Sequence, residues 1–120
     1  MYTVKVRANF SSAHNLRDYK GKCEDLHGHN WKVEVAVSSE SLNKTGMVVD
    51  FKDLKKFLNE VMEELDHTNL NDLAPFSTIN PTSENIAKYV YDEISAKDKE
   101  LRVQYVTVWE TDTSEATYSV

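Results

Sequence analysis

Cysteine is nearly absent from this 120-residue chain, which has Cys23 and no other thiol. No disulfide can therefore form within the chain. An excess of positive charge is absent too, because 20 acidic residues outnumber 14 basic ones and give a net charge of −6. Proteins that bind duplex DNA or RNA usually carry a basic patch, so we expect no nucleic-acid partner.

Long apolar runs are also missing. No stretch approaches the roughly 18 apolar residues that a membrane span needs. The start of the chain, residues 1–7, carries charges where a secretory signal would have an apolar run. A free thiol without such a signal is typical of the cytosol. We therefore expect a cytoplasmic protein with no membrane partner.

The apolar residues that are present follow the periods of strands and helices. Hydrophobic residues make up 40% of the chain and charged residues 28%, which indicates one globular domain over residues 1–120. The expected elements are strands 2–10 and 31–37, a helix 51–65 capped by Asp50, a helix to about residue 96 capped by Thr82 or Ser83, and strands 101–110 and 115–120. This β-β-α-α-β-β order predicts an α+β fold, with an antiparallel sheet and two helices on one face.

Three of the four histidines fall where a hairpin would bring them together. His27 and His29 flank one glycine before the second strand, and side chains two apart in a strand share a face. The apolar residues of the first two strands share one face if Phe10 lies opposite Trp31. The same register puts His14 opposite His27, although a slip by two residues would preserve the face. Three neutral imidazoles with a coordination position left open are typical of catalytic Zn²⁺ sites.

Further candidate residues lie outside the histidine group. Cys23 follows Lys20 and Lys22, where cations and a metal would favour the thiolate, although cysteine is also a common buried residue. His67, after Asp66, follows the first helix, where a protonated histidine would also interact well with the helix dipole. Glu110 shares a strand face with two valines, which fits either a solvated strand end or a ligand contact. Spacing alone leaves these roles open.

Five segments spread over the chain carry motifs: FSSAH at 10–14, CEDLHGH at 23–29, LDH at 65–67 with LND at 70–72, PTSEN at 81–85, and WET at 109–111 with Ala116 and Tyr118. Together they resemble the 6-pyruvoyltetrahydropterin synthase and 6-carboxytetrahydropterin synthase family. The resemblance implies the tunnelling fold, in which subunits form trimeric barrels that stack into homohexamers. It also implies active sites between subunits.

The resemblance implies a zinc-dependent lyase and assigns roles by position. The three histidines named above would bind zinc, and Cys23 would be the base that abstracts a proton. His67 would relay protons with support from Asp66 and Glu110. Glu110 would also anchor the pterin, because a carboxylate can accept two parallel hydrogen bonds from the edge of the ring. The residues that would help to line the pterin pocket are Thr82 and Ser83.

Within the family, the chain most resembles the 6-carboxytetrahydropterin synthases, which convert 7,8-dihydroneopterin triphosphate to 6-carboxytetrahydropterin, acetaldehyde and triphosphate for queuosine and other deazapurines. Formation of 6-pyruvoyltetrahydropterin is the nearest alternative. Relatives with a glutamate in the signature loop cleave dihydroneopterin to 6-hydroxymethyldihydropterin for folate, and Glu24 beside Cys23 leaves this activity open as well. A non-catalytic module that binds zinc or pterin is an alternative of another class.

Overall fold

The computed structural model describes residues 1–21 and 24–120, so Cys23 and its predicted role as a base lie outside the described residues. Four strands form one antiparallel sheet in the order β1-β2-β3-β4. The strands are β1 (Tyr2–His14), β2 (His27–Ser39), β3 (Val103–Thr111) and β4 (Ser114–Tyr118), and the helices between β2 and β3 are α1 (Phe51–Leu65) and α2 (Ser83–Lys97). The predicted order of elements is confirmed.

β1 and β2 form a long hairpin. Phe10 pairs with Trp31 and His14 pairs with His27, which confirms the proposed register and excludes the two-residue slip. Both strands are longer than predicted, because the ladder continues through the histidines. β1 therefore ends at His14 and β2 begins at His27.

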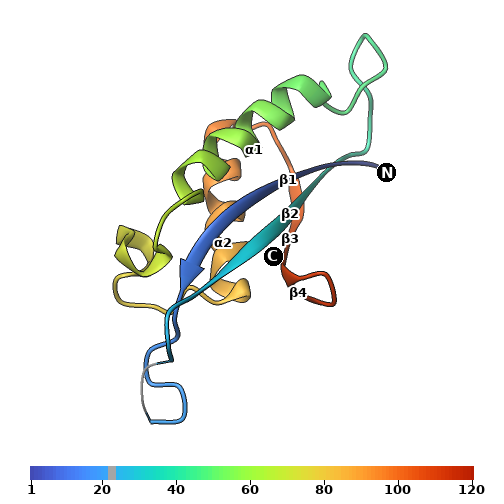
Figure 1. The fold of residues 1–120 in the computed structure, drawn as a ribbon. Helices are drawn as coiled ribbons and strands as arrows, with labels where there is room; N and C mark the ends of the chain where they lie inside the picture. The colour runs from blue at the N-terminus through green and yellow to red at the C-terminus, as the bar shows by residue number, and fades with distance from the viewer. Residues whose placement is uncertain (22–23) are drawn as a thin grey trace.

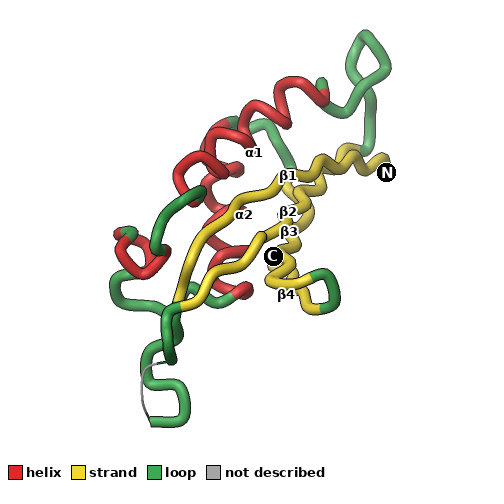
Figure 2. Tube along the Cα trace, in the orientation of Figure 1, coloured by secondary structure: helices red, strands yellow, loops and turns green. Residues whose placement is uncertain are grey.

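Both helices cover the same side of the sheet (Figures 1 and 2). α1 packs on β1, and α2 packs on β3 and β4. Each helix begins at a predicted cap, since Asp50 Oδ1 accepts from Lys52 N at 2.9 Å and Thr82 Oγ1 accepts from Asn85 N at 3.1 Å. Such a cap contributes about 1 kcal/mol to stability.

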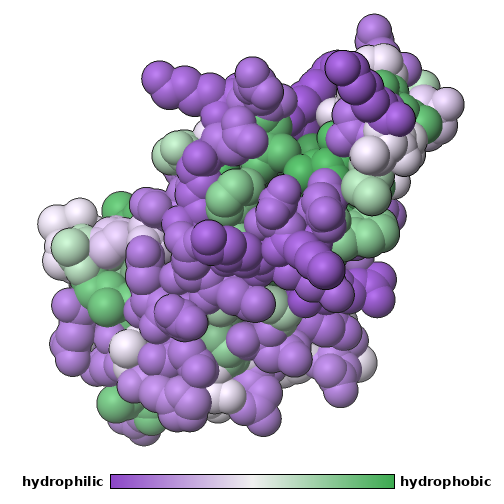
Figure 3. Space-filling model, turned by 90° about the horizontal axis from the view of Figure 1, so that it is seen from above, coloured by the Kyte–Doolittle hydropathy of each residue, from purple (hydrophilic) through white to green (hydrophobic). Residues whose placement is uncertain are grey.

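The hydrophobic core lies between this face of the sheet and the helices. Its side chains alternate along the strands and recur at three- and four-residue steps along the helices, as burial of one face requires. The fully buried ones include Val33, Val35, Val106, Val108, Leu54, Leu58, Val61, Ile86, Val90 and Ile94. Seen from above, the surface is mainly hydrophilic, with apolar residues in separate groups (Figure 3). Over the described residues, no helix is both long and apolar enough to cross a membrane.

The connection between the helices is bound to the edge strand β1. It contains two 3₁₀ turns, Leu70–Asp72 and Ala74–Phe76, where the sequence indicated only a polar connection. Before these turns the chain runs beside β1: Ala13 N donates to Thr68 O at 3.0 Å, and Ala13 forms a parallel bridge with Asn69. This contact brings the segment after α1 next to the histidine end of the hairpin.

Candidate metal centre and its surroundings

Three histidines converge where the hairpin opens into the β1–β2 loop. One ring nitrogen from each of His14, His27 and His29 lies within 4.8 Å of the other two. The Nε2 atoms of His14 and His27 are 3.1 Å apart. The alternation of side chains along β1 and β2 places all three rings on the helix-covered face. The structure therefore brings the three predicted ligands together.

Backbone carbonyls orient two of the rings. His14 Nδ1 lies 2.8 Å from Pro81 O, and His27 Nδ1 lies 2.9 Å from Asp25 O. Because a carbonyl oxygen can only accept, each Nδ1 carries the proton and each Nε2 presents a lone pair. Two facing lone pairs repel unless a proton or a cation lies between them. This arrangement suits a metal ion, and such carbonyl contacts commonly orient metal-binding histidines.

His29 provides an independent observation. Its Nε2 is buried and has no hydrogen-bond partner among residues 1–21 and 24–120. Burial lowers the pKa of His29, although the nearby Glu110 carboxylate opposes this shift. A neutral imidazole with a free lone pair is the form that binds a divalent metal. The three rings therefore fit a metal ion.

Aromatic side chains back the histidines. Trp31 is fully buried, and its ring meets those of His14 and His29 edge-on, with centroids 4.9 and 5.4 Å away. Phe10 stacks on Trp31 with the centroids 5.6 Å apart. Trp31 Nε1 donates to Ser12 O at 3.2 Å. The alternation of the second strand indicated that Trp31 is a core residue, but its contact with the histidines depends on the pairing of the hairpin.

Glu110 places a carboxylate beside two of the histidines. Its oxygens lie 3.6 Å from His14 Nε2 and 3.7 Å from His29 Nε2, and its side chain is about one-third exposed. Glu110 therefore faces His14 and His29 from the end of β3. Its predicted contacts with a pterin and with His67 stay predictions.

Asp66 and His67 are held against β1 by hydrogen bonds to the backbone of Ser11. Asp66 Oδ1 accepts from Ser11 N at 2.7 Å, and this bond is the main reason why the pKa of Asp66 is lowered. His67 N donates to Ser11 O at 2.7 Å. The His67 ring is 84% exposed, with Nδ1 2.8 Å from Asp66 Oδ2. His67 also has a left-handed backbone with φ of 54°, which is uncommon for a residue other than glycine.

The N-terminus of α2 lies next to the three-histidine cluster. Pro81, whose carbonyl bonds to His14, directly precedes Thr82 and Ser83. The two residues predicted to line a pterin pocket therefore follow a residue that touches a histidine of the cluster. The role of the Pro81 carbonyl was missed from the sequence, because a backbone contact between residues 67 positions apart leaves no pattern in the side chains.

Glu24 is bound into the base of the β1–β2 loop. Its N donates to Leu16 O at 2.9 Å, and its Oε1 accepts from Leu16 N at 3.2 Å. The same carboxylate oxygen lies 3.7 Å from His27 Nδ1. Glu24 therefore closes the loop beside a histidine of the cluster.

Comparison with known proteins decides the family. Residues 3–120 match the family model described as 6-pyruvoyl tetrahydropterin synthase. The chain belongs to this family. A 6-carboxy-5,6,7,8-tetrahydropterin synthase of Synechocystis is 39% identical over 126 residues, which cover 98% of this chain and 93% of that protein. A dihydroneopterin monophosphate aldolase of Pyrococcus furiosus is 38% identical over 108 residues, which cover 89% and 88% of the two chains.

The architecture agrees with the sequence match. The structure of Caenorhabditis elegans 6-pyruvoyl tetrahydropterin synthase has a TM-score of 0.87 and 30% identity, and the match covers 99% of this chain and 95% of that one. The predicted tunnelling fold is thus confirmed. Members of the family process pterins, but the relatives bear three different names. Family membership alone therefore does not select the reaction.

Proposed function

We propose that the chain is a zinc-dependent 6-carboxytetrahydropterin synthase, which converts 7,8-dihydroneopterin triphosphate to 6-carboxy-5,6,7,8-tetrahydropterin, acetaldehyde and triphosphate for queuosine biosynthesis. The observation that carries this proposal is the three-histidine group in a chain of this family, with a His29 Nε2 that has no hydrogen-bond partner among the described residues. The Synechocystis relative, which matches almost the whole chain, supports the choice of the carboxy product.

Zinc is the proposed metal because imidazole is one of its preferred ligands and three protein ligands leave a position for substrate. When bound, the ion would supply Lewis acidity toward the hydroxylated side chain of the pterin. His14, His27 and His29 would hold it. The buried Trp31 covers one side of the His14 and His29 rings, and Glu110 adds a negative charge beside the same two rings.

Cys23 is the proposed base, and His67 is the proposed proton relay. One oxygen of the Asp66 carboxylate accepts a hydrogen bond from Ser11 N, and the other contacts Nδ1 of His67. Nε2 of His67 is therefore free to exchange protons. Proton transfers at adjacent carbons with loss of triphosphate need one base and one relay. For the pterin ring we propose an anchor at Glu110 and a pocket that includes Thr82 and Ser83.

The exposure of His67 motivates a site shared between subunits of a cytoplasmic homohexamer built from two trimers. If Cys23 and His67 reach one site from different subunits, mixed oligomers of Cys23→Ala and His67→Ala chains will regain part of the activity, because some sites hold neither substitution. No recovery after verified subunit exchange would place both residues in one subunit.

A second candidate is cleavage of dihydroneopterin to 6-hydroxymethyldihydropterin with Glu24 as the base. It is favoured by the name of the Pyrococcus furiosus relative and by the position of the Glu24 carboxylate near His27. The hydrogen bond from Leu16 N opposes it, because this bond engages the carboxylate that would have to accept a proton.

One experiment separates these functions. The zinc-loaded protein is incubated with dihydroneopterin triphosphate and, separately, with dihydroneopterin, and the products are identified by mass. We expect 6-carboxytetrahydropterin from the triphosphate and its loss in Cys23→Ala. The second function would be supported if the wild type releases the hydroxymethyl product and Glu24→Ala does not. Glu40→Ala, in a remote exposed loop, is the control and should still release it. A pyruvoyl product would change the assignment within the family, and zinc binding without any product would indicate a non-catalytic module.

A further inference from the structure

The β1–β2 loop begins with two residues whose backbones are each paired to one asparagine side chain. Asn15 N donates to Asn71 Oδ1 and Asn71 Nδ2 donates to Asn15 O, both at 2.9 Å. Arg17 N donates to Asn80 Oδ1 at 2.8 Å, and Asn80 Nδ2 donates to Arg17 O at 3.0 Å. A side-chain amide has one acceptor and two donor hydrogens, so it can replace the two-bond exchange of a strand pair. We call these two pairs the asparagine clamps.

The asparagine clamps continue the contact that begins at the end of β1. Ser11 and Ala13 bond to residues 66–68 through their outward backbone groups. Asn15 and Arg17, at the next two alternate positions, bond to the same connection through the clamps. Every second residue from 11 to 17 is therefore bonded to the connection between α1 and α2. This contact continues beyond His14, where the pairing of β1 with β2 ends.

The side chain of Arg17 strengthens this contact from the other direction. Its guanidinium donates to the carbonyl oxygens of Asn71, Phe76 and Ile79 at 3.3, 2.7 and 3.1 Å. These three carbonyls lie in the connection between α1 and α2, which contains two short 3₁₀ turns and no longer element. Arg17 thus fixes the shape of the segment that carries both asparagines.

The asparagine clamps join segments to which the proposed reaction assigns roles. Asn15 follows His14 directly, and Asn71 lies four residues after His67. Asn80 lies two residues before Thr82, and its carbonyl accepts from Asn85 Nδ2 at 2.8 Å in the first turn of α2. At the other end of the loop, Asn15 Nδ2 donates to Glu24 O at 3.2 Å.

We propose that Asn71 and Asn80 are positioning residues for the pterin reaction. They hold residues 15–17, the start of the β1–β2 loop, in a defined place relative to the histidines, the His67 segment and the N-terminus of α2. This proposal rests on the proposed function for its kinetic consequences but not for its structural ones. Both side chains are only half-buried, so water can replace their hydrogen bonds after truncation and the fold should survive.

The test compares Asn71→Ala and Asn80→Ala with Asn43→Ala. Asn43 is a matched control, because its Oδ1 accepts from Thr45 N and Met47 N at 3.0 Å in the loop at the opposite end of the hairpin. Amide hydrogen exchange, zinc content and steady-state kinetics are measured on the zinc-loaded proteins. In Asn71→Ala we expect residues 15–17 to lose protection, zinc content to stay at the wild-type value, and kcat to fall roughly 10- to 100-fold with little change in KM.

Asn80→Ala should differ from Asn71→Ala in a way that a general loss of stability would not produce. Because Asn80 precedes the proposed pterin pocket, we expect KM to rise more than kcat falls. Asn43→Ala should lose exchange protection only in its own loop and leave both kinetic constants within about twofold of the wild type, as surface changes remote from a site usually do.

Several outcomes would overturn the proposal. Retained protection at residues 15–17 in Asn71→Ala would show that the clamp does not hold the loop. Lost protection with an unchanged kcat would show that the loop position does not matter for the reaction. If Asn71→Ala fails to fold, Asn71→Asp keeps an acceptor for Asn15 N, removes the donor to Asn15 O and adds a negative charge, and an unchanged kcat in that variant would overturn the proposal. A wild-type protein without pterin turnover would contradict the proposed function, while hydrogen exchange would still decide whether the clamps hold the loop.

Discussion

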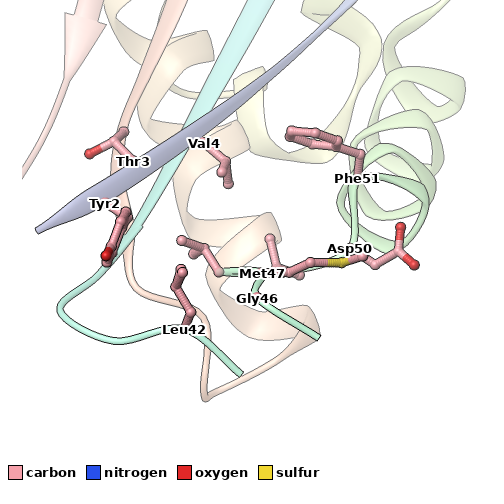
Figure 4. Close-up of a pocket in the computed structure, with 10 residues that line it drawn as sticks. Tyr2, Thr3, Val4, Leu42, Gly46, Met47, Asp50 and Phe51 are labelled. Atoms are coloured by element: carbon pink, nitrogen blue, oxygen red, sulfur yellow. The ribbon is translucent and has the colours of Figure 1, made fainter. Parts of the chain in front are cut away.

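The two ends of the β1–β2 hairpin differ in chemistry, although the same two strands pair along its whole length. At one end three imidazoles gather within 4.8 Å, backed by Trp31, and the loop beyond them is held by polar side chains. At the other end apolar side chains, including Tyr2, Val4, Leu42 and Met47, surround a pocket of about 420 Å³ (Figure 4). The strand pairing is the same, so side-chain chemistry makes the difference.

The two ends of the hairpin also differ in how their polar and apolar side chains are buried. The far end is an ordinary apolar edge of the fold, where Met47 and Phe51 are about half-exposed. The histidine end buries His14 almost completely and leaves His29 Nε2 without a partner in the part of the chain that the structure describes. Burying a polar group without a partner destabilises a fold. The three histidines could offset this cost by holding a metal ion, and we expect substitutions at the histidine end to affect metal binding in a way that those at the far end do not.

The largest expected effect is that of His14→Ala. It removes one of three ligands, so we expect the loss of stoichiometric zinc and of activity with the sheet still folded. Metal content by elemental analysis and circular dichroism check this. Leu42→Ala at the far end is the control and should retain the zinc. Full zinc occupancy in His14→Ala would show that His14 is not a required zinc ligand. It would also contradict the prediction that substitutions at the histidine end affect metal binding.

A large loss of stability is expected from Phe10→Ala. Phe10 is 2% exposed and stacks on Trp31, so truncation should cost about 3–5 kcal/mol in the free energy of unfolding. Val4→Ala, in the same strand near the far end, removes a half-buried side chain and should cost about 1 kcal/mol. Urea unfolding of the two variants measures the difference, and equal losses would mean that the packing does not differ along β1.

A smaller and pH-dependent effect is expected from Asp66→Asn. The hydrogen bond from Ser11 N lowers the pKa of Asp66 in the folded state, so its charged form stabilises the fold above the pKa of the unfolded chain, which is about 3.9. The stability difference from the wild type should be present at pH 7 and disappear as the pH falls through the lowered folded-state pKa. Unfolding of both metal-free proteins between pH 7 and about pH 2 tests this, because the difference should fade only below the unfolded-state pKa, and a difference that does not change with pH would refute it.

The smallest effect is expected from Met47→Ser. The side chain is 42% exposed in the far pocket, so the free energy of unfolding should change by no more than about 0.5 kcal/mol, with zinc content unaltered. Thermal unfolding and elemental analysis check it. A change in the mass of the assembly would instead show that another chain covers this end.

Much of the fold could be predicted because it follows local periods. The strand alternation, the helical steps and the caps at Asp50 and Thr82 are properties of neighbouring residues, and the structure confirms them. The two-residue spacing of His27 and His29 likewise placed both rings on one face. The end of β1 was predicted too early, because polar residues such as Ser11 and Ser12 interrupt the apolar alternation although they remain paired with β2.

The surroundings of the candidate site could not be predicted in this way. Glu110 could have been a solvated strand end, and only the sheet order puts its carboxylate beside His14 and His29. Glu24 could have been a free loop carboxylate, and only the closure of the loop bonds it to Leu16. Each outcome depends on which segment lies opposite, and the type of residue does not determine that.

The sequence by itself determined the elements, their order, the face that carries the three histidines and the family, because these depend on short-range periods and on motifs. The tertiary structure decided the hairpin register between two allowed choices, the contacts of Glu24 and Glu110, and the asparagine clamps. Those clamps join residues 56 and 63 positions apart in the chain. A single amide that bonds a distant backbone leaves no repeat in the sequence, so its role becomes visible only when packing brings the two segments together.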